Sequence, residues 1–361
     1  MTEPRAPPHE SATRTTEENT LTLPPHPGRP AGPLSRRRFG QLATLALAAG
    51  AGSFPFASAT AATADGQVYY DRARRLAGDD PVLLTLVKAL TPGGAAPRPD
   101  APEPIRIFDN LAMLSAGWVS AMAVLTDDGI VLIDALTSSQ EAENIIVRGL
   151  HTLGADPETI TYIVVTHGHH DHYGGARYLA GRYGARVLMS STDWDLVART
   201  DPDNAPARGL DIDDGHRLTL GGTSIRLHHT PGHTPGTVSP VFPVRTGGRR
   251  HTAMLWGGLK PPSEPAELRT YLASIGSFRH LMRQAGVDVE LSNHPNDHSL
   301  QRAEQLRDDP HGENPFVLGR PRTQRYMEVM ELMLRGRLAD AAGAGAGLRR
   351  TAAGPVPEGC C

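Results

Sequence analysis

The alternation of apolar and polar positions predicts a run of strands from residue 105 onward. Apolar segments at 105–108, 111–114, 119–125 and 130–133 are typical of strands, and Asp127-Asp128-Gly129 predicts a hairpin turn between the last two. Ser138-Ser139-Gln140-Glu141 is a capping-box start for a helix that runs to about Leu153 and stops at Gly154. The pattern then predicts strands at 161–165 and 186–189 and helices at about 174–182 and 192–199.

The second half of the chain repeats this order. Strands are predicted at 217–220, 223–228, 237–244, 250–255 and 287–291, and helices at about 265–284, 298–308 and 319–341. Two strand-rich halves that each end in helices predict two sheets packed face to face, with the helices outside.

The flanking segments differ from this pattern. Residues 1–34 are polar and rich in Pro, Thr and Glu, so we expect them to be disordered. Residues 65–104 predict an N-terminal helical segment, broken near Asp80-Pro81, and then a linker. The main domain is expected over 105–341 with its C-terminal helices, and 342–361 is predicted to be a flexible tail.

Residues 35–64 resemble a twin-arginine export signal. Ser35-Arg36-Arg37-Arg38-Phe39 precedes a short, Gly/Ala-rich apolar stretch and small residues suited to cleavage. The resemblance implies a protein exported, folded, by the twin-arginine machinery to the periplasm or the outside. The stretch is too short for a stable membrane span. The alternative is a chance arginine cluster before a buried helix.

Composition narrows the function classes. There are 36 basic and 39 acidic residues, for a net charge of -3, so nothing favours a nucleic-acid partner. The two cysteines are Cys360 and Cys361, which excludes a disulfide framework, a cysteine metal site and a cysteine nucleophile within the main domain. The chain also has 16 histidines, and these need an explanation.

The histidines concentrate in one motif that directly follows an apolar strand. Residues 166–175 read THGHHDHYGG and contain the pattern H-x-H-x-D-H. His167 and His169 are spaced to reach one metal ion, and Asp171 and His172 can turn to a second. Imidazole with one carboxylate suits zinc, although these ligand types also accommodate iron.

Further ligands must come from distant segments. His233 lies in a tight TPGHTPG loop, and His294 lies in SNHP, each directly after a predicted strand. A lone loop histidine is usually a surface or hydrogen-bonded residue. With the H-x-H-x-D-H motif in the same chain, we expect His233 and His294 to be metal ligands instead. Both follow strands, and strand ends can converge on one edge of a sandwich.

Together these segments resemble the metallo-beta-lactamase fold superfamily over about residues 105–300. The resemblance implies an α+β, four-layer αββα sandwich that binds two zinc ions. It implies that Asp134, at the end of an apolar strand, supports the ligands from behind. By the same resemblance, the first zinc is bound by His167, His169 and His233, and the second by Asp171, His172 and His294.

One departure from the superfamily pattern is informative. Most of its hydrolases have a metal-bridging aspartate at the end of a later strand, where this chain reads Leu255-Trp256-Gly257-Gly258-Leu259. That weighs against glyoxalase II, quorum-lactonase, RNase Z and persulfide-dioxygenase functions. In this respect the chain resembles the third metallo-beta-lactamase subclass, whose second zinc is held by Asp, His and His.

The functional hypothesis is hydrolysis of an amide or ester bond by metal-activated hydroxide, with β-lactams as the named candidate. Asp171 would orient the nucleophile. Two zinc ions against one carboxylate favour a small anionic substrate. Lys260 either binds its carboxylate or is a solvated loop lysine, and Tyr173 either lines the pocket or packs. The alternatives are a lactone, thioester or phosphate/sulfate ester hydrolase, and a metal-binding protein without turnover.

Overall fold

The computed structural model describes residues 66–93, 98–295 and 297–352, and these all belong to one compact unit. The predicted polar segment 1–34 and the predicted export signal 35–64 lie outside the described residues. A search of the described helices finds none that is long and apolar enough to cross a membrane.

The first sheet follows the order of the chain. Strands β1 to β4 pair antiparallel, and β4 to β7 pair parallel, so the later strands all end at one edge. The strands are β1 Ile105–Phe108, β2 Leu111–Ser115, β3 Ser120–Thr126, β4 Gly129–Ile133, β5 Ile160–Val164, β6 Arg186–Ser190 and β7 Leu210–Ile212.

The second sheet has the order β12-β11-β10-β9-β8. Its strands pair antiparallel except β11 and β12, which are parallel. They are β8 His216–Leu220, β9 Thr223–His229, β10 Val238–Thr246, β11 Arg249–Trp256 and β12 Val289–Ser292.

Apolar side chains fill three separate layers of core. One lies between the sheets and includes Val131, Phe242 and Leu291. A second packs the outer face of the first sheet against the helical segments that join its strands. These segments are α3 Ser139–Glu141, the π-helical Ala142–Val147, α4 Arg148–Thr152, the 3-10 turn Pro157–Thr159, α5 His170–Tyr173, α6 Ala176–Tyr183 and α7 Ser191–Thr200.

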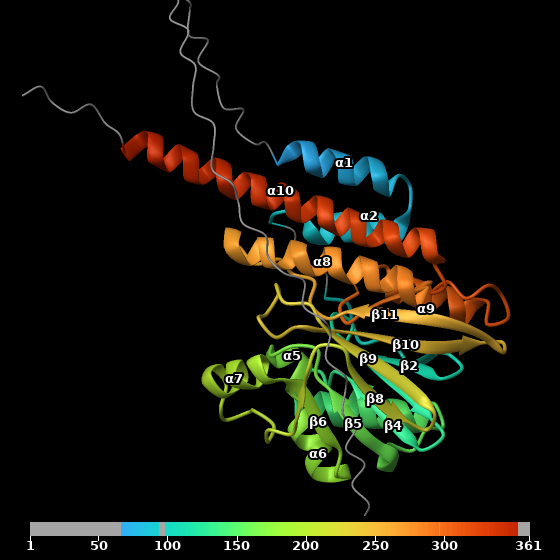
Figure 1. Ribbon diagram of the computed structural model, residues 1–361. Helices are drawn as coiled ribbons and strands as arrows, with labels where there is room; N and C mark the ends of the chain where they lie inside the picture. Colours follow the sequence, from blue (N-terminus) through green and yellow to red (C-terminus); the bar gives the residue numbers. More distant parts are fainter. Residues whose placement is uncertain (1–65, 94–97, 296, 353–361) are drawn as a thin grey trace, which may run out of the picture. The chain divides into compact units, whose positions relative to one another are not determined.

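The third layer of core covers the outer face of the second sheet. There α1, α2, α8 and α10 gather together, the blue α1 lying along the red α10 (Figure 1). Their bounds, with that of α9, are α1 Gln67–Ala77, α2 Pro81–Leu90, α8 Pro265–Ala285, α9 Ser299–Asp308 and α10 Arg320–Ala352. Helices on both outer faces of two packed sheets confirm the predicted αββα sandwich.

Three local features differ from the sequence prediction. Helix α10 runs to Ala352, beyond the helix end predicted at about 341; the residues after 341 are rich in alanine, which has high helix propensity, and contain no proline before Pro355. The segment 166–172, expected to be a loop, contains the first residues of α5. The three-residue strand β7 was not predicted, because its sequence Leu-Asp-Ile is too short for a periodicity to show.

Candidate metal centre

The six predicted metal ligands converge on one edge of the sandwich. His167 follows β5 after two residues, His233 lies between β9 and β10, and His294 follows β12. Two backbone hydrogen bonds join the sheets at this edge, from Val238 N to Thr166 O and from Ser120 N to Asn293 O, both 2.8 Å. The edge is therefore held together independently of any bound ion.

His167, His169 and His233 form the first group. Nε2 of His233 lies 3.1 Å from Nε2 of His167 and 3.0 Å from Nδ1 of His169. Nitrogens bonded at about 2.0–2.1 Å to one tetrahedral zinc would be separated by roughly 3.4 Å. The three nitrogens are therefore close to the spacing that a shared ion imposes.

The tautomers of His167 and His233 favour a cation between them. Nδ1 of His167 lies 2.8 Å from the carbonyl oxygen of Gly257, and Nδ1 of His233 lies 2.6 Å from that of Lys260. A carbonyl only accepts, so both Nδ1 atoms carry the proton. In the neutral rings, Nε2 of each is then a bare lone pair facing the other. A metal ion satisfies both.

The electrostatics keep these rings neutral. Burial and the neighbouring imidazoles lower the pKa of His167 well below its ordinary value, and lower that of His233 to about 3. Burial likewise lowers the pKa of His169. Neutral imidazole is the form that binds metal, so the group is ready to bind an ion at neutral pH.

Asp171, His172 and His294 form the second group. The Asp171 carboxylate lies 3.3 Å from Nε2 of His172 and 3.5 Å from Nε2 of His294, and the two Nε2 atoms are 3.2 Å apart. Burial opposes ionisation of Asp171, but the two imidazoles outweigh it and hold the pKa of its carboxyl below its usual range. One carboxylate and two imidazoles again suit zinc.

Each imidazole of the second group is oriented by an oxygen on its far side. Nδ1 of His294 donates to the carbonyl oxygen of Trp118 at 2.7 Å. Nδ1 of His172 donates to the buried Asp134 carboxylate, also at 2.7 Å. Burial lowers the pKa of His172, but Asp134 and Asp171 outweigh it and raise the pKa to about 10.

Asp134 lies behind the ligands, where the resemblance placed it. Besides His172, its carboxylate accepts hydrogen bonds from the backbone N–H and the hydroxyl of Thr166, next to His167. Its backbone has φ 64, in the left-handed region that is uncommon for a non-glycine residue. The hydrogen-bond network holds Asp134 in that conformation.

Two residues that the sequence analysis did not single out also link the ligand segments. The Asn293 amide donates to Asp134, to Thr166 Oγ1 and to Gly257 O, at 3.0–3.1 Å. Asp193, buried in α7, accepts from the N–H of Gly168 and of Gly236 at 2.7 and 2.9 Å. Asp193 therefore joins the loop of His167 to the loop of His233.

The segment after β11 has no room for a bridging carboxylate. A Cβ on Gly257 would lie 1.9 Å from Val238 O, and one on Gly258 would lie 2.5 Å from Cδ2 of His233. The backbone itself is used here, since Gly257 O orients His167. An aspartate at either of these two positions would therefore clash with its neighbours, in agreement with the glycines that the sequence has there.

A cavity of about 710 Å³ opens onto both groups. Among the described residues, Asp171 is its only carboxylate, and Trp118, Leu259 and Pro261 supply apolar surface. The full lining is Ala89, Leu90, Gly93, Arg98, Trp118, His167, His169, Asp171, His233, Leu259, Lys260, Pro261, His294 and Arg337. Lys260 therefore borders the cavity. Of the two alternatives for Lys260, binding of a substrate carboxylate requires this position.

Tyr173 does not line this cavity, which corrects the pocket-lining alternative. Its side chain is 1% exposed and packs in the core of the first sheet, and its hydroxyl donates to Asp201 at 2.8 Å. The short helix α5 turns Tyr173 inward, one residue after His172. Of the two alternatives for Tyr173, packing describes the structure.

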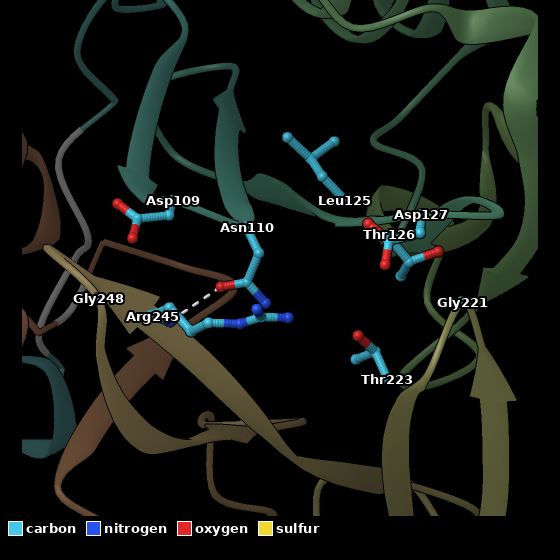
Figure 2. A pocket seen from close by; sticks show the side chains of 9 residues that line it. All are labelled: Asp109, Asn110, Leu125, Thr126, Asp127, Gly221, Thr223, Arg245 and Gly248. Carbon is cyan, nitrogen blue, oxygen red and sulfur yellow. Dashed lines mark hydrogen bonds between the residues drawn. The ribbon is translucent and has the colours of Figure 1, made fainter.

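A second cavity, of about 410 Å³, lies at the opposite ends of the strands (Figure 2). It is bordered by the hairpin turns near Asn110, Asp127, Gly221 and Gly248. Asn110 Oδ1 accepts a hydrogen bond from the backbone N–H of Arg245 at 2.9 Å. The two candidate metal groups among the described residues lie at the other edge, so that edge is the candidate functional site.

The fold is the metallo-beta-lactamase fold. The sequence model of the metallo-beta-lactamase superfamily matches residues 116–246, a range that includes five of the six candidate ligands. Similar solved structures extend the likeness beyond that range. The Rm3 metallo-beta-lactamase is 25% identical with a TM-score of 0.57, over 67% of this chain and 95% of that one.

Two further similar proteins have different names. The subclass B3 metallo-beta-lactamase BJP-1 of Bradyrhizobium japonicum is 21% identical with a TM-score of 0.52, over 70% of this chain and 95% of that one. A hydroxyacylglutathione hydrolase of Pseudomonas aeruginosa (strain LESB58) is 37% identical over 95 residues, or 26% of this chain and 33% of the relative. The chain thus spans a third of that relative's length. Together the comparisons support a metal-dependent hydrolase.

The hydroxyacylglutathione hydrolase match qualifies one sequence inference. The sequence weighed against glyoxalase II, a thioester hydrolase, because residues 255–259 have no aspartate. The comparison shows that a stretch of 95 residues is nevertheless similar to such an enzyme.

Proposed function

We propose that this protein is an exported di-zinc hydrolase that cleaves an amide or ester bond of a small anionic substrate. The observation that carries the proposal is the facing pair of Nε2 lone pairs on His167 and His233, with both Nδ1 protons donated to carbonyl oxygens. Such a pair is unfavourable without a cation. We assign the first zinc to His167, His169 and His233, and the second to Asp171, His172 and His294.

The chain's own groups have distinct roles in this proposal. Zinc bound at these groups lowers the pKa of water and polarises a carbonyl. Asp171 is ionised and borders the cavity, so its carboxylate can orient the attacking water and accept its proton. The Asp134 carboxylate holds the ring of His172 from the opposite side.

The cavity favours an anionic substrate with an apolar body. Lys260 borders it, and the Lys260 carbonyl oxygen orients the ligand His233. The Lys260 ammonium is therefore placed to bind a substrate carboxylate close to the first group of ligands. β-Lactams, which combine a cyclic amide with a carboxylate, are the first candidate, and the third-subclass ligand set supports them.

Thioesters are the second candidate, favoured by the similarity to hydroxyacylglutathione hydrolase. A thioester with carboxylates in its thiol part would meet the same positive surface. The two candidates differ in the bond cleaved and in the leaving group, so a substrate panel separates them.

The deciding experiment measures zinc content and turnover of the chain from residue 65 onward. Nitrocefin and S-lactoylglutathione serve as substrates, and His169→Ala is compared with His170→Ala. His170 is the matched control because it is adjacent and exposed and pairs with Asp201 at 2.9 Å, outside both groups. We expect about two zinc ions per chain and turnover in the parent and in His170→Ala, and loss of both in His169→Ala.

Other outcomes separate the remaining hypotheses. Two zinc ions without turnover of any substrate in a panel of β-lactams, thioesters, lactones and phosphate or sulfate esters would favour a metal-binding protein. A preparation that takes up iron and is active only with iron would change the metal. A protein that binds no metal would remove the proposal.

We propose export through the twin-arginine route on the basis of residues 35–64. The test expresses the full chain with Arg36→Lys and Arg37→Lys together, because that route reads the arginine pair. We expect the parent to be recovered outside the cytoplasm and the double variant to be retained. Equal distribution of both would contradict an export signal at this position.

A further inference from the structure

Three cationic side chains border the cavity without an ionic partner. Arg98, Lys260 and Arg337 line it, and among the described residues none of them takes part in an ion pair. Every other side chain of the lining is apolar, except the metal-ligand candidates. Arg98 and Lys260 are exposed, whereas Arg337 is half-buried, a position where a cation is usually paired. Their gathering at one cavity therefore points to an anionic ligand.

Arg337 is the most firmly placed of the three. It lies on α10, and its Nε donates to the Leu90 carbonyl oxygen, at the end of α2, at 3.0 Å. Helices α2 and α10 also pack against each other through the core that includes Val87, Leu90 and Leu334. This bond uses one donor of the guanidinium, and the terminal NH2 groups remain for a planar anion.

Arg98 adds a second cation to the lining of the cavity. Its guanidinium lies over the ring of Trp118, with 4.2 Å between Cζ and the ring centroid. Trp118 itself borders the cavity, and its carbonyl oxygen orients His294. Stacking on an aromatic ring orients an arginine without neutralising its charge.

These arginines come from elements that supply none of the candidate metal ligands. The superfamily match covers residues 116–246, and both Arg98 and Arg337 lie outside it. Arg337 belongs to α10 in the helical layer, and Arg98 belongs to the segment between α2 and β1. Lys260 reaches the cavity from the segment after β11. The anionic ligand would thus be held by different elements from those that hold the metal.

We infer that Arg337, assisted by Arg98, forms a subsite for a second anionic group of the substrate, separate from the carboxylate assigned to Lys260. The inference rests on the proposed function and narrows its substrates to elongated molecules. Such a substrate has an anionic group at each end, or a single anionic group distant from the scissile bond. Leu90, Leu259 and Pro261 supply apolar surface for the part between. Arg337 is thus a specificity-determining residue.

The test uses two esters with one leaving group, mono-4-nitrophenyl glutarate and the neutral 4-nitrophenyl butyrate. Arg337→Gln should lower kcat/KM for the anionic ester about tenfold and leave that for the neutral ester unchanged, since charge-assisted hydrogen bonds are lost only with the former. Arg337→Lys should retain most of the preference. The matched control is Arg335→Gln on the same helix, which removes an exposed pair with Glu331.

Direct binding separates this inference from the proposed function. Calorimetric titration of the zinc-loaded protein with glutarate should give about tenfold weaker binding to Arg337→Gln than to the parent or Arg335→Gln. If neither ester is hydrolysed but glutarate binding depends on Arg337, the subsite stands and ester hydrolysis fails. The subsite is overturned if glutarate does not bind, or if Arg337→Gln changes hydrolysis of both esters equally or of neither. In those cases, turnover of either ester would still support the proposed function.

Discussion

At the scale of single residues, the centre is organised by oxygen atoms behind the imidazoles. His167, His233 and His294 each have Nδ1 fixed by a backbone carbonyl, and Nδ1 of His172 is fixed by the Asp134 carboxylate. These bonds set the tautomer and leave Nε2 directed to the neighbouring ligands. The geometry of the site therefore depends on residues that touch no ion themselves.

Asp193 provides one test of this dependence. In the parent, one carboxylate oxygen of Asp193 accepts from the Gly168 N–H and the Thr234 hydroxyl, and the other accepts from the Gly236 N–H. In Asp193→Asn, an NH2 group replaces one of these oxygens, so a donor there faces another donor. We expect zinc affinity to fall about 10–100-fold, as for other residues that orient ligands. Competition with a chelating dye measures the zinc affinity. Asp195→Asn, which loses only an exposed pair with Arg208, is the control, and equal affinity of the two variants would contradict the role.

Gly258 provides a steric test. A methyl group in Gly258→Ala would lie 2.5–2.7 Å from the His233 ring and Cβ, so the ring must move away from His167. We expect loss of one of the two proposed zinc ions and of most of the proposed turnover, measured by metal analysis and kinetics. Gly276→Ala, in α8 with open space around its Cα, should leave zinc content unchanged and stabilise the fold by roughly 0.5–1 kcal/mol. Full zinc content in Gly258→Ala would refute the steric argument.

At the scale of elements, the helical layer on the second sheet depends on contacts far apart in the sequence. Asp80 caps the N-terminus of α2 through the N–H of Val82, and its carboxylate also pairs with Arg322 of α10 at 2.6 Å. The Tyr70 hydroxyl of α1 donates to Asp340 of α10 at 2.7 Å. These polar contacts, together with the apolar core beneath, fix the helix that presents Arg337 to the cavity.

The Asp80 contact predicts a pH dependence of stability. Burial raises the pKa of the Asp80 carboxyl, but Arg322 and the capped N–H groups outweigh it and lower the pKa below its usual range. A lowered folded-state pKa stabilises the protein above the unfolded value, near 3.9, and the gain is lost as pH falls through the folded value. Asp80→Ala should cost about 1–2 kcal/mol at pH 7 and clearly less at pH 3.

Urea denaturation at both pH values measures this difference, and Asp80→Asn serves as the comparison. Asparagine keeps the N-cap but not the ion pair, so its loss at pH 7 should be smaller than that of alanine. A loss in Asp80→Ala that is the same at pH 3 and pH 7 would show that the ionised carboxylate does not stabilise this layer.

At the scale of the whole molecule, the metal groups lie where the two sheets meet, so bound metal should stabilise the sandwich as a unit. A ligand that binds only the folded state adds about 2.7 kcal/mol at a free concentration 100 times its Kd. We expect a chelator to lower the melting temperature by several degrees and added zinc to restore it, as measured by calorimetry. His169→Ala should show a smaller shift, and an unchanged melting temperature would argue against bound metal.

Much of the fold was predictable because its signals are local. The strands from 105 to 133 and the long helices α8 and α10 follow from apolar periodicity, and Gly154 and Gly286 end helical segments where left-handed backbone is required. The end of α10 and strand β7 were missed. Alanine and glycine leave the end of a helix undefined, and a three-residue strand is stabilised only by its neighbour β6.

The sequence by itself determined the six candidate ligands, because H-x-H-x-D-H and the two later histidines each follow a strand, and strand ends meet at one edge. Only the tertiary structure decided that Tyr173 packs inward and that Asp193 and Asn293 link the ligand loops. It also placed Arg337 in the lining of the same cavity as His233, which precedes it by 104 residues (337 − 233) in the chain. Those assignments depend on long-range packing and on hydrogen bonds between distant segments, which no local periodicity encodes.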